Sequence, residues 1–550
     1  MLLTAASIGV NATAVNVDTL FTSATVYGHP NAESVGISDG IITFIGTSQA
    51  GRLVKNADTE IIDLRGAALF PGFVDNHNHV FEAASEVGGG CEVSAKASLL
   101  EQIPYLQFCR QHAKRGQWVI GYGHYLESIL SDDDEMTPLE VLDSIFPDQP
   151  VVIMEQTSHS MWVNSQALAS VGFTLKTDDP QGGVILKDDD VMLGILLDNA
   201  GDLVMEKAWN SLKGKFNQSY DGLINGLQAV AANGITTVGD GRLYWKRGWY
   251  DVWRTVEKDG DLTARVSIRP WVYPEGDKQA QLAFFKKIRR DNPTQRLLVN
   301  QVKLYSDGLL ENGTAKMLAP YQETIIPQYP HGINYISQRD MQWWLQQLSA
   351  IGYGAHIHTI GDGGVHESLN AIEAAKQAGS TQDYALTHVE FVDRADLTRF
   401  KSLGVTADFQ LGSDHVLHAE NKTATRLLGK HPERDAIPIG KLYRQGANVS
   451  LSSDWNVNPL SPLTAIANAV SMGTRGLPSL AAAIDAYTIN PAKSLGLDEV
   501  TGSIELGKSA DFAVLSTDIS NLSPRQIKKT QVLMTVLQGE IVYDAAKTSH

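Results

Sequence analysis

One pattern recurs along the chain and limits what it can fold into: a stretch with helical periodicity ends at a glycine, and a short apolar, β-rich run follows. Four clear copies occupy residues 227–240, 345–359, 397–410 and 441–454. A glycine at a helix end can adopt the left-handed conformation that stops the helix. We expect this conformation at Gly234, Gly352, Gly404 and Gly446. Apolar strands that do not alternate with polar residues are buried on both faces, which is typical of a parallel sheet covered by helices.

Eight strands of this kind can be counted, and with helices between them they favour a closed (β/α)8 barrel over residues 71–498. The expected strands are residues 71–79, 235–240, 265–272, 299–305, 353–359, 384–390, 405–410 and 449–454. A chain of 550 residues is too long for one ordinary core, but it suits one large barrel with insertions. Residues 118–123 and 151–156 also read as strands, and we place both in a long insertion, residues 85–230, after the first barrel strand.

The two ends of the chain are rich in short β runs separated by turns. Asp39-Gly40 lies between two such runs and predicts a hairpin, and Gly539 separates two more runs near the C-terminus. We expect residues 17–70 and 499–546 to meet as one small β-sandwich domain. The predicted fold class is therefore α/β: a distorted, TIM-like (β/α)8 barrel with a long insertion and a small β-sandwich domain built from both ends.

The net charge limits the kinds of partner that the protein can bind. The formal net charge of −17 would repel phosphate backbones and anionic lipid, so nucleic acid and membrane surfaces are poor partners. The sequence also has no uninterrupted apolar run of 18 residues that would predict a membrane span. We expect a small-molecule substrate, neutral or cationic, and a homodimer would be ordinary for a chain of this size.

Cysteine content and the first residues bear on the compartment. Cys91 and Cys109 are the only cysteines, too few for a disulfide framework or a cysteine-based metal cluster. Residues 1–12 are small and apolar and end in a Val-x-Ala triplet. They read either as the remnant of an export signal, which implies a periplasmic or secreted protein, or as an ordinary terminus of a cytoplasmic one.

The stretch PGFVDNHNH, residues 71–79, ends a buried run with two histidines one residue apart. In a strand, residues i and i+2 point the same way, so His77 and His79 should converge at the mouth of the barrel. Two imidazoles held close together suit a divalent metal ion. The alternative is a pair of polar residues that leave a strand into solvent.

Further ligand-type side chains follow other expected strands at the same end. They are Lys303 on the fourth strand, His358 on the fifth, His388 on the sixth and Asp454 on the eighth. Barrel enzymes keep their chemistry at this face. With so few cysteines, a metal here would be held by His, Asp, Glu or Lys. His356 shares a strand face with His358 and is either a further ligand or a core histidine.

These residues carry a family resemblance. The motifs PGFVDNHNH, HTIGD, THVE, SSDWNVNP and GSIELGKSADFAVL, together with Lys303, resemble the amidohydrolase superfamily. The stretches HSMWVNSQAL (159–168) and KLYSDGLLENGTA (303–315) are similar to its YtcJ-like branch, amidohydrolase family 3, which includes N-substituted formamide deformylase. The match runs over nearly the whole chain.

The resemblance implies two divalent ions, most often zinc. His77 and His79 would bind one ion, His358 and His388 the other, and Lys303 would bridge them as a carbamate. A carboxylated lysine is anionic and offers two oxygens, whereas an ammonium group would be repelled by two cations; an unmodified Lys303 implies a mononuclear site. Asp454 would contact the metal and act as the general base for a metal-bound hydroxide that attacks a carbonyl.

The function expected from this site is hydrolysis of the C–N bond of an amide, formamide or cyclic amide. Two alternatives within the superfamily are a deaminase, against which Lys303 counts, and a lactone or ester hydrolase. A third is an inactive barrel that serves as a binding or regulatory protein.

Several softer candidates for substrate contact lie in loops and in the insertion. They are His159, Asn164, His331 and His415. His159 and Asn164 are equally compatible with a structural role at the start of a helix, and His331 and His415 with ordinary surface positions.

Overall fold

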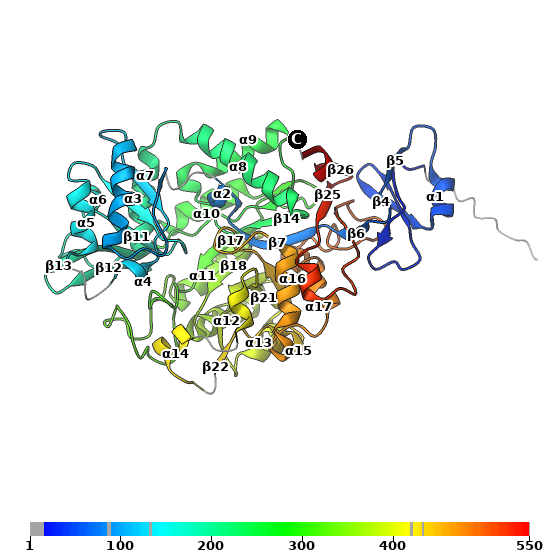
Figure 1. Cartoon of the computed structure of the whole chain (residues 1–550). Coiled ribbons are helices and arrows are strands. Elements are labelled where there is room, and N and C mark those ends of the chain that lie inside the picture. Colours follow the sequence, from blue (N-terminus) through cyan, green and yellow to red (C-terminus); the bar gives the residue numbers. More distant parts are fainter. Residues whose placement is uncertain (1–15, 85–89, 131–134, 419–421, 432–433, 549–550) are drawn as a thin grey trace, which may run out of the picture.

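Eight parallel strands form the centre of the protein in the computed structural model, which describes residues 16–84, 90–130, 135–418, 422–431 and 434–548 (Figure 1). The strands are β7 (Phe73–Asn78), β14 (Ile235–Asp240), β15 (Arg265–Ser267), β17 (Gln301–Tyr305), β18 (Gly354–Thr359), β19 (Tyr384–His388), β21 (Val405–Gln410) and β23 (Asn448–Ser452). Each overlaps one of the eight strands predicted from the sequence.

The strands are arranged as an irregular barrel. β7, β14 and β15 form one parallel run, and β17, β18, β19, β21 and β23 form a second. A single bridge between Trp271 and Lys303 joins the two runs on one side, and β23 lies against β7 on the other. The hydrogen-bonded ladder is therefore interrupted at both joints, which matches the predicted distortion.

Helices alternate with these strands along the chain. They are α8 (Lys215–Ala232), α9 (Trp249–Asp259), α10 (Lys278–Ile288), α11 (Gln338–Ala350), α12 (Asp362–Gln377), α13 (Leu397–Leu403) and α15 (Ile439–Arg444). The four glycines predicted to end helices all have positive φ angles, between 66° and 82°. This left-handed conformation lets each of these helices stop one to three residues before the next strand.

The insertion is a domain-sized unit with its own mixed sheet. In spatial order its strands are β12 (Gly183–Asp188), β13 (Val191–Asp198), β11 (Ser160–Val163), β10 (Val151–Met154), β9 (Val119–Tyr122) and β8 (Cys91–Glu92). The two extra β runs noted in the sequence are β9 and β10, so both lie outside the barrel. The predicted span of 85–230 includes most of α8, which packs on the barrel strand β14. Figure 1 shows the insertion at the left of the barrel.

The two cysteines of the insertion are bonded to each other. Cys91 begins β8, and Cys109 lies on α3 (Ile103–His112), 18 residues further along the chain. The chain thus contains one local cross-link rather than a disulfide framework. A loop of this size loses conformational entropy in the unfolded state when it is closed, so the bond stabilises this edge of the insertion.

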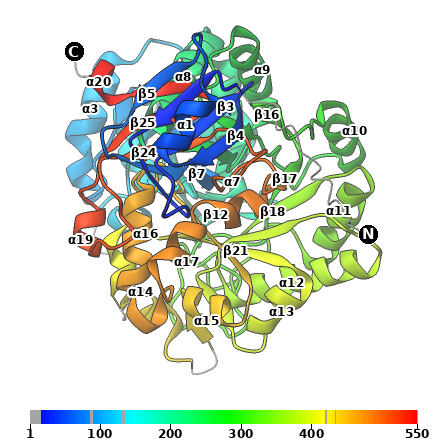
Figure 2. The same ribbon diagram turned by 90° about the vertical axis from the view of Figure 1, so that its right-hand side faces the viewer.

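Both ends of the chain contribute to one sheet, as predicted. β6 (Ala68–Pro71) pairs with β24 (Phe512–Leu515), and the sheet continues through β25 (Val532–Leu537) and β26 (Glu540–Asp544). A second sheet contains β3 (Ser34–Ser38) and β4 (Ile41–Gly46), joined by the predicted hairpin at Asp39-Gly40. One apolar core lies between the two sheets. In Figure 2 these small sheets face the viewer and the barrel lies behind them.

Within the described residues, no helix is long and apolar enough to cross a membrane. Residues 1–12, on which the alternative of an export signal rests, lie outside the described part of the chain.

Candidate metal centre and active site

The histidine pair at the end of β7 converges on one carboxylate. His77 Nε2 and His79 Nε2 each lie 3.3 Å from Asp454 Oδ1, which follows β23 on the neighbouring side of the barrel. The other ring nitrogen of His77, Nδ1, lies 2.9 Å from Nε2 of His356, which is fully buried. His356 therefore supports His77 from inside the barrel.

Two further histidines, His358 and His388, lie next to this group of side chains. His388 Nδ1 lies 4.0 Å from Asp454 Oδ2, and the rings of His358 and His388 lie 4.5 Å apart, centroid to centroid. One possible ligand atom each of His77, His388 and Asp454 lie within 4.8 Å of one another. Residues from β7, β18, β19 and the end of β23 thus meet at one rim, because the carboxyl ends of parallel barrel strands face the same way.

Lys303 lies beneath these side chains without a polar partner. Its side chain is fully buried in β17, and Nζ has no hydrogen bond within the described part of the chain. Burial lowers the pKa of Lys303 well below its usual value, and the nearby Asp454 carboxylate opposes this shift only in part. A buried, uncharged amine without a hydrogen-bond partner destabilises the fold unless another group bonds to it.

The protonation states of His77, His358 and Asp454 suit metal ligands. Burial lowers the pKa of His77 and of His358 well below the usual histidine value, so both rings are neutral at pH 7. Burial alone would raise the pKa of Asp454, but hydrogen bonds from His77 and His79 outweigh it and hold the pKa well below its usual value. Neutral imidazoles and an ionised carboxylate are the forms that bind metal ions.

The backbone is strained where these ligands leave their strands. His388, Val389 and Asp454 have φ angles of 74°, 48° and 52°. Residues with a Cβ rarely adopt this left-handed region, and such conformations are concentrated at functional sites, where the surrounding structure holds them. The strain turns the His388 and Asp454 side chains toward the common rim.

A network of charged side chains contacts His79 through its Nδ1 atom. His79 Nδ1 donates to Glu82 Oε2 at 2.6 Å, and Arg242 donates to Glu82 Oε1 at 3.1 Å and to the Tyr305 hydroxyl at 3.1 Å. The Tyr305 ring in turn stacks on His358, with centroids 4.4 Å apart. Burial opposes it, but Glu82 and Asp454 raise the pKa of His79 to about 9. With this pKa, both ring nitrogens of His79 are protonated at pH 7, and the ring must release its Nε2 proton before it can bind a metal ion. The network holds the orientation of the ring and links it to the opposite side of the rim.

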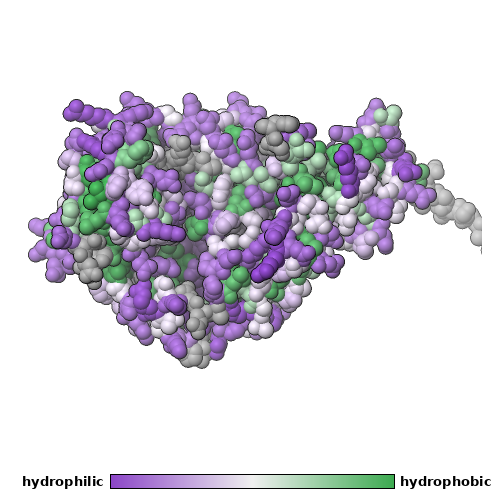
Figure 3. Space-filling view, viewed as in Figure 1, coloured by the Kyte–Doolittle hydropathy of each residue, from purple (hydrophilic) through white to green (hydrophobic). Residues whose placement is uncertain are grey.

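The rim opens into a cavity of about 1600 Å³ between the barrel and the insertion. Figure 3 shows the surface hollowed between these two parts, with the insertion at the left. His358, His388 and Asp454 line the cavity from the barrel, and Leu126 and Thr157 line it from the insertion. The insertion therefore contributes a wall of the same space that contains the candidate ligands.

The predicted substrate contacts divide into two groups. His159 and His415 line the cavity. Asn164 does not: its side chain accepts from the backbone of Val151 and Ala167 and caps α6 (Ser165–Val171), so the structural role is correct. His331 lies outside the cavity, where its Nδ1 bonds the Met317 carbonyl.

Several residues of the site were not predicted from the sequence. Glu82 could have been found, because it follows His79 by three residues at the start of α2 (Val80–Ala84), a spacing that brings side chains together. Arg242 and Asp198 give no such signal, because they are distant in sequence from Glu82 and His159, which they contact. Two cavity carboxylates, Glu311 and Glu390, lie within the motifs KLYSDGLLENGTA and THVE but were not singled out as site residues.

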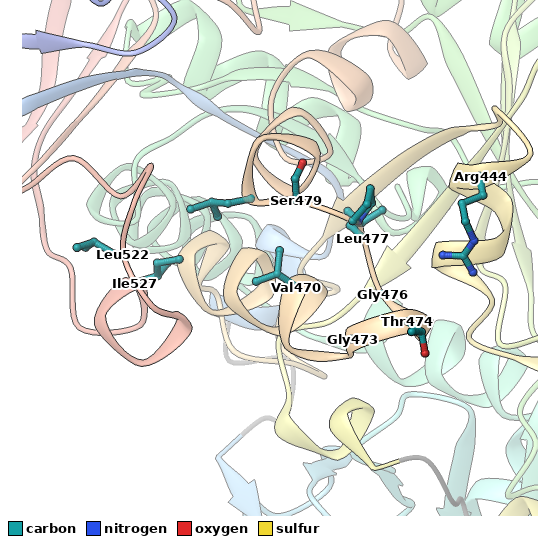
Figure 4. Close-up of a pocket in the computed structure, with 11 residues that line it drawn as sticks. Arg444, Val470, Gly473, Thr474, Gly476, Leu477, Ser479, Leu522 and Ile527 are labelled. Carbon is teal, nitrogen blue, oxygen red and sulfur yellow. The ribbon is translucent and has the colours of Figure 1, made fainter.

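A second cavity, of about 390 Å³, lies on the outside of the molecule (Figure 4). Val470, Leu477, Leu522 and Ile527 give it a largely apolar wall, and Arg444, Thr474 and Ser479 are its polar side chains. None of the candidate metal ligands lines it, so the chemistry of the protein belongs to the larger cavity.

The donor set fits divalent metal ions. It combines imidazole nitrogens with a carboxylate, which suits zinc and similar ions. Two buried polar atoms of the rim, Lys303 Nζ and His358 Nδ1, have no hydrogen-bond partner among the described residues. Coordination of a metal ion by His358 and carboxylation of Lys303 would give both atoms a partner.

Comparison with known proteins gives a matching family model, related sequences and a related structure. A model of the amidohydrolase family matches residues 60–543. The chain is 27% identical to the Bacillus subtilis protein YtcJ over 93% of this chain and 96% of that protein. It is 26% identical to N-substituted formamide deformylase of Arthrobacter pascens over 93% of this chain and 95% of that enzyme. An uncharacterized metal-dependent hydrolase from Pyrococcus furiosus shares the fold, with a TM-score of 0.67, 21% identity, and coverage of 91% of this chain and 99% of that one.

Proposed function

Because this chain belongs to the amidohydrolase family, we propose that it is a metal-dependent hydrolase that cleaves the C–N bond of a small amide. One observation supports this most directly: His77, His388 and Asp454 converge at a rim that also contains an unpaired, uncharged Lys303. The similarity to a formamide deformylase favours N-substituted formamides or related amides as substrates.

We assign the ligands as the sequence suggested. His77 and His79 would hold one ion and His358 and His388 the other, most simply zinc. Lys303 would bridge them after its neutral Nζ has added to carbon dioxide and lost one proton, which leaves an anionic carbamate. A bound divalent ion lowers the pKa of a coordinated water and polarises a carbonyl group. The low pKa of Lys303 supports the carbamate, because only the uncharged amine has the lone pair that adds to carbon dioxide.

Asp454 would move the proton. Its Oδ1 is held by His77 and His79, and Oδ2 is the oxygen nearer His388, at the edge of the cavity. As the water oxygen bonds to the amide carbon, Asp454 accepts its proton. The same group then gives this proton to the amide nitrogen as the C–N bond breaks, so that a carboxylic acid and an amine leave. A carboxylate with a low pKa is ionised at neutral pH and ready for the first transfer.

The test combines metal removal with one substitution. Dialysis against a chelator should abolish hydrolysis of a panel of N-formyl, N-acyl, cyclic imide and lactone compounds, and added zinc should restore it. Asp454→Asn should keep the metal ions but lower kcat by about a hundredfold or more. Asp251→Asn, an exposed position on α9, is the matched control. Substantial turnover by Asp454→Asn, or no amide turnover by the metal-loaded wild type, would overturn the proposal.

A further inference from the structure

The loop that carries Asp454 is bonded to the barrel at its start and to the insertion further along. The Asp454 N–H donates to the His77 carbonyl at 2.7 Å, and the Trp455 carbonyl accepts from the His79 N–H at 2.9 Å. Asn456 follows, and its Nδ2 donates to the hydroxyl of Tyr122 at 3.0 Å, across 334 residues of sequence. Among the described residues, this is the one hydrogen bond of the Asn456 side chain. The insertion therefore contacts the loop two residues after the candidate general base.

The Tyr122 hydroxyl has a fixed place. Tyr122 ends β9, an inner strand of the insertion sheet, which pairs with β8 on one side and β10 on the other. The hydroxyl lies 2.9 Å from Gln156 Oε1 and 3.1 Å from the Gln156 carbonyl, both of which can only accept. A phenol has one hydrogen and can also accept, so its hydrogen goes to Gln156 and a lone pair receives the Asn456 amide. The hydroxyl thus joins the rigid insertion sheet to the Asp454 loop.

The conformation of this loop needs support from its surroundings. Asp454 has a φ of 52°, and a residue with a Cβ keeps such a backbone only where neighbouring groups hold it. The barrel holds the loop before Asn456 through β7 and after it through Asn458, whose Oδ1 accepts from Ser413 at 2.7 Å. Tyr122 holds the stretch between these two points. Small displacements of a reacting group lower the rate strongly, so a contact this close to Asp454 can affect proton transfer.

From these contacts we infer that Tyr122 is a positioning residue for hydrolysis: through Asn456 it holds Asp454 where its carboxylate can accept and return the proton. The inference rests on the proposed function, because Tyr122 acts through the general base named there. Tyr122 is not among the described residues that line the large cavity, so it acts without touching the substrate. The insertion thereby contributes to the chemical step as well as to the cavity wall.

The experiment removes the hydrogen bond from either side and measures kcat and KM separately. Tyr122→Phe and Asn456→Ala should each lower kcat by about tenfold for every amide that the wild type hydrolyses, and should change KM by less than about twofold. Zinc content should stay that of the wild type. Tyr329→Phe is the matched control and should keep the wild-type kcat. The Tyr329 hydroxyl also joins the barrel to the insertion, at Asp179 over 2.9 Å, but Tyr329 lies in the segment between β17 and α11.

A double variant separates positioning of Asp454 from general support of the fold. If Tyr122 acts through the Asp454 carboxylate, its effect disappears once that carboxylate is gone, because two changes to one working unit are not additive. Tyr122→Phe should therefore lower the residual kcat of Asp454→Asn by about twofold or less. A merely structural role would give the same tenfold loss in both backgrounds. The comparison of kcat with KM decides the question by itself if Asp454→Asn shows no residual turnover.

Each outcome supports or overturns the inference. Wild-type kcat in Tyr122→Phe, or an undiminished loss in the Asp454→Asn background, would overturn it. A change confined to KM or to some amides would also overturn it, because Tyr122 would then contact the substrate, and so would a loss of zinc. All of these results leave the hydrolase assignment intact. A metal-loaded wild type that hydrolyses no amide would refute the proposed function itself.

Discussion

The buried amine of Lys303 gives a prediction about stability that needs no substrate. The side chain is fully buried, and Nζ has no hydrogen bond among the described residues. Its pKa lies well below the usual value in the folded protein because of burial, whereas in the unfolded chain it is about 10.4. Between these two values the unfolded chain binds one proton more than the folded one. Raising the pH therefore stabilises the fold, by about 1.4 kcal/mol per pH unit.

The size of this effect on the free energy of unfolding follows from the pKa of lysine in the unfolded chain. If Nζ is uncharged in the folded, metal-free protein, keeping it so costs about 3 kcal/mol at pH 8 and about 1 kcal/mol at pH 9.5. Lys303→Met has a similar volume and removes this cost. We expect the metal-free variant to be more stable than the metal-free wild type, and we expect its advantage to shrink by about 2 kcal/mol between pH 8 and pH 9.5.

Urea unfolding in a chelator and in buffer without carbon dioxide measures this difference. Lys55→Met, at an exposed position that follows α1 (Ser48–Val54), controls for the substitution itself and should show no pH-dependent difference from the wild type. Zinc and bicarbonate should then stabilise the wild type but not Lys303→Met. Parallel pH profiles for the wild type and Lys303→Met would refute the reasoning, because they would mean that Nζ is charged and solvated in the fold.

Two further predictions concern the support of the site and of the insertion. Glu82→Gln keeps the shape of the side chain but removes the charge that orients His79, so we expect zinc affinity to fall by about tenfold to a hundredfold in chelator competition, with little change in melting temperature. Unaltered affinity would show that Arg242 and Tyr305 hold the rim without it. Replacing Cys91 and Cys109 by serine opens a loop of 18 residues and should destabilise the insertion by about 3 kcal/mol, measured by urea unfolding against the wild type with and without reductant. A variant as stable as the oxidised wild type would contradict the chain-entropy argument.

The sequence alone determined the barrel and the candidate ligands, because both depend on local patterns. Helical periodicity ending at Gly234, Gly352, Gly404 or Gly446 marks each helix-to-strand junction, and residues that follow parallel strands at the same end must share a rim. His77, His358, His388 and Asp454 were therefore found without a structure, and so was Lys303, which is unusual in an apolar strand. The hairpin at Asp39-Gly40 was found for the same kind of reason.

Only the tertiary structure decided what the remaining polar residues do. Asn164 caps a helix, His356 supports His77, and His159 meets Asp198 across a distance of 39 residues. These outcomes depend on how the insertion folds and where it lies against the barrel, which is set by the sum of many weak packing contacts between distant segments. No local period encodes such contacts, so the same histidine or asparagine in the sequence is equally compatible with a cavity wall, a helix cap and the core.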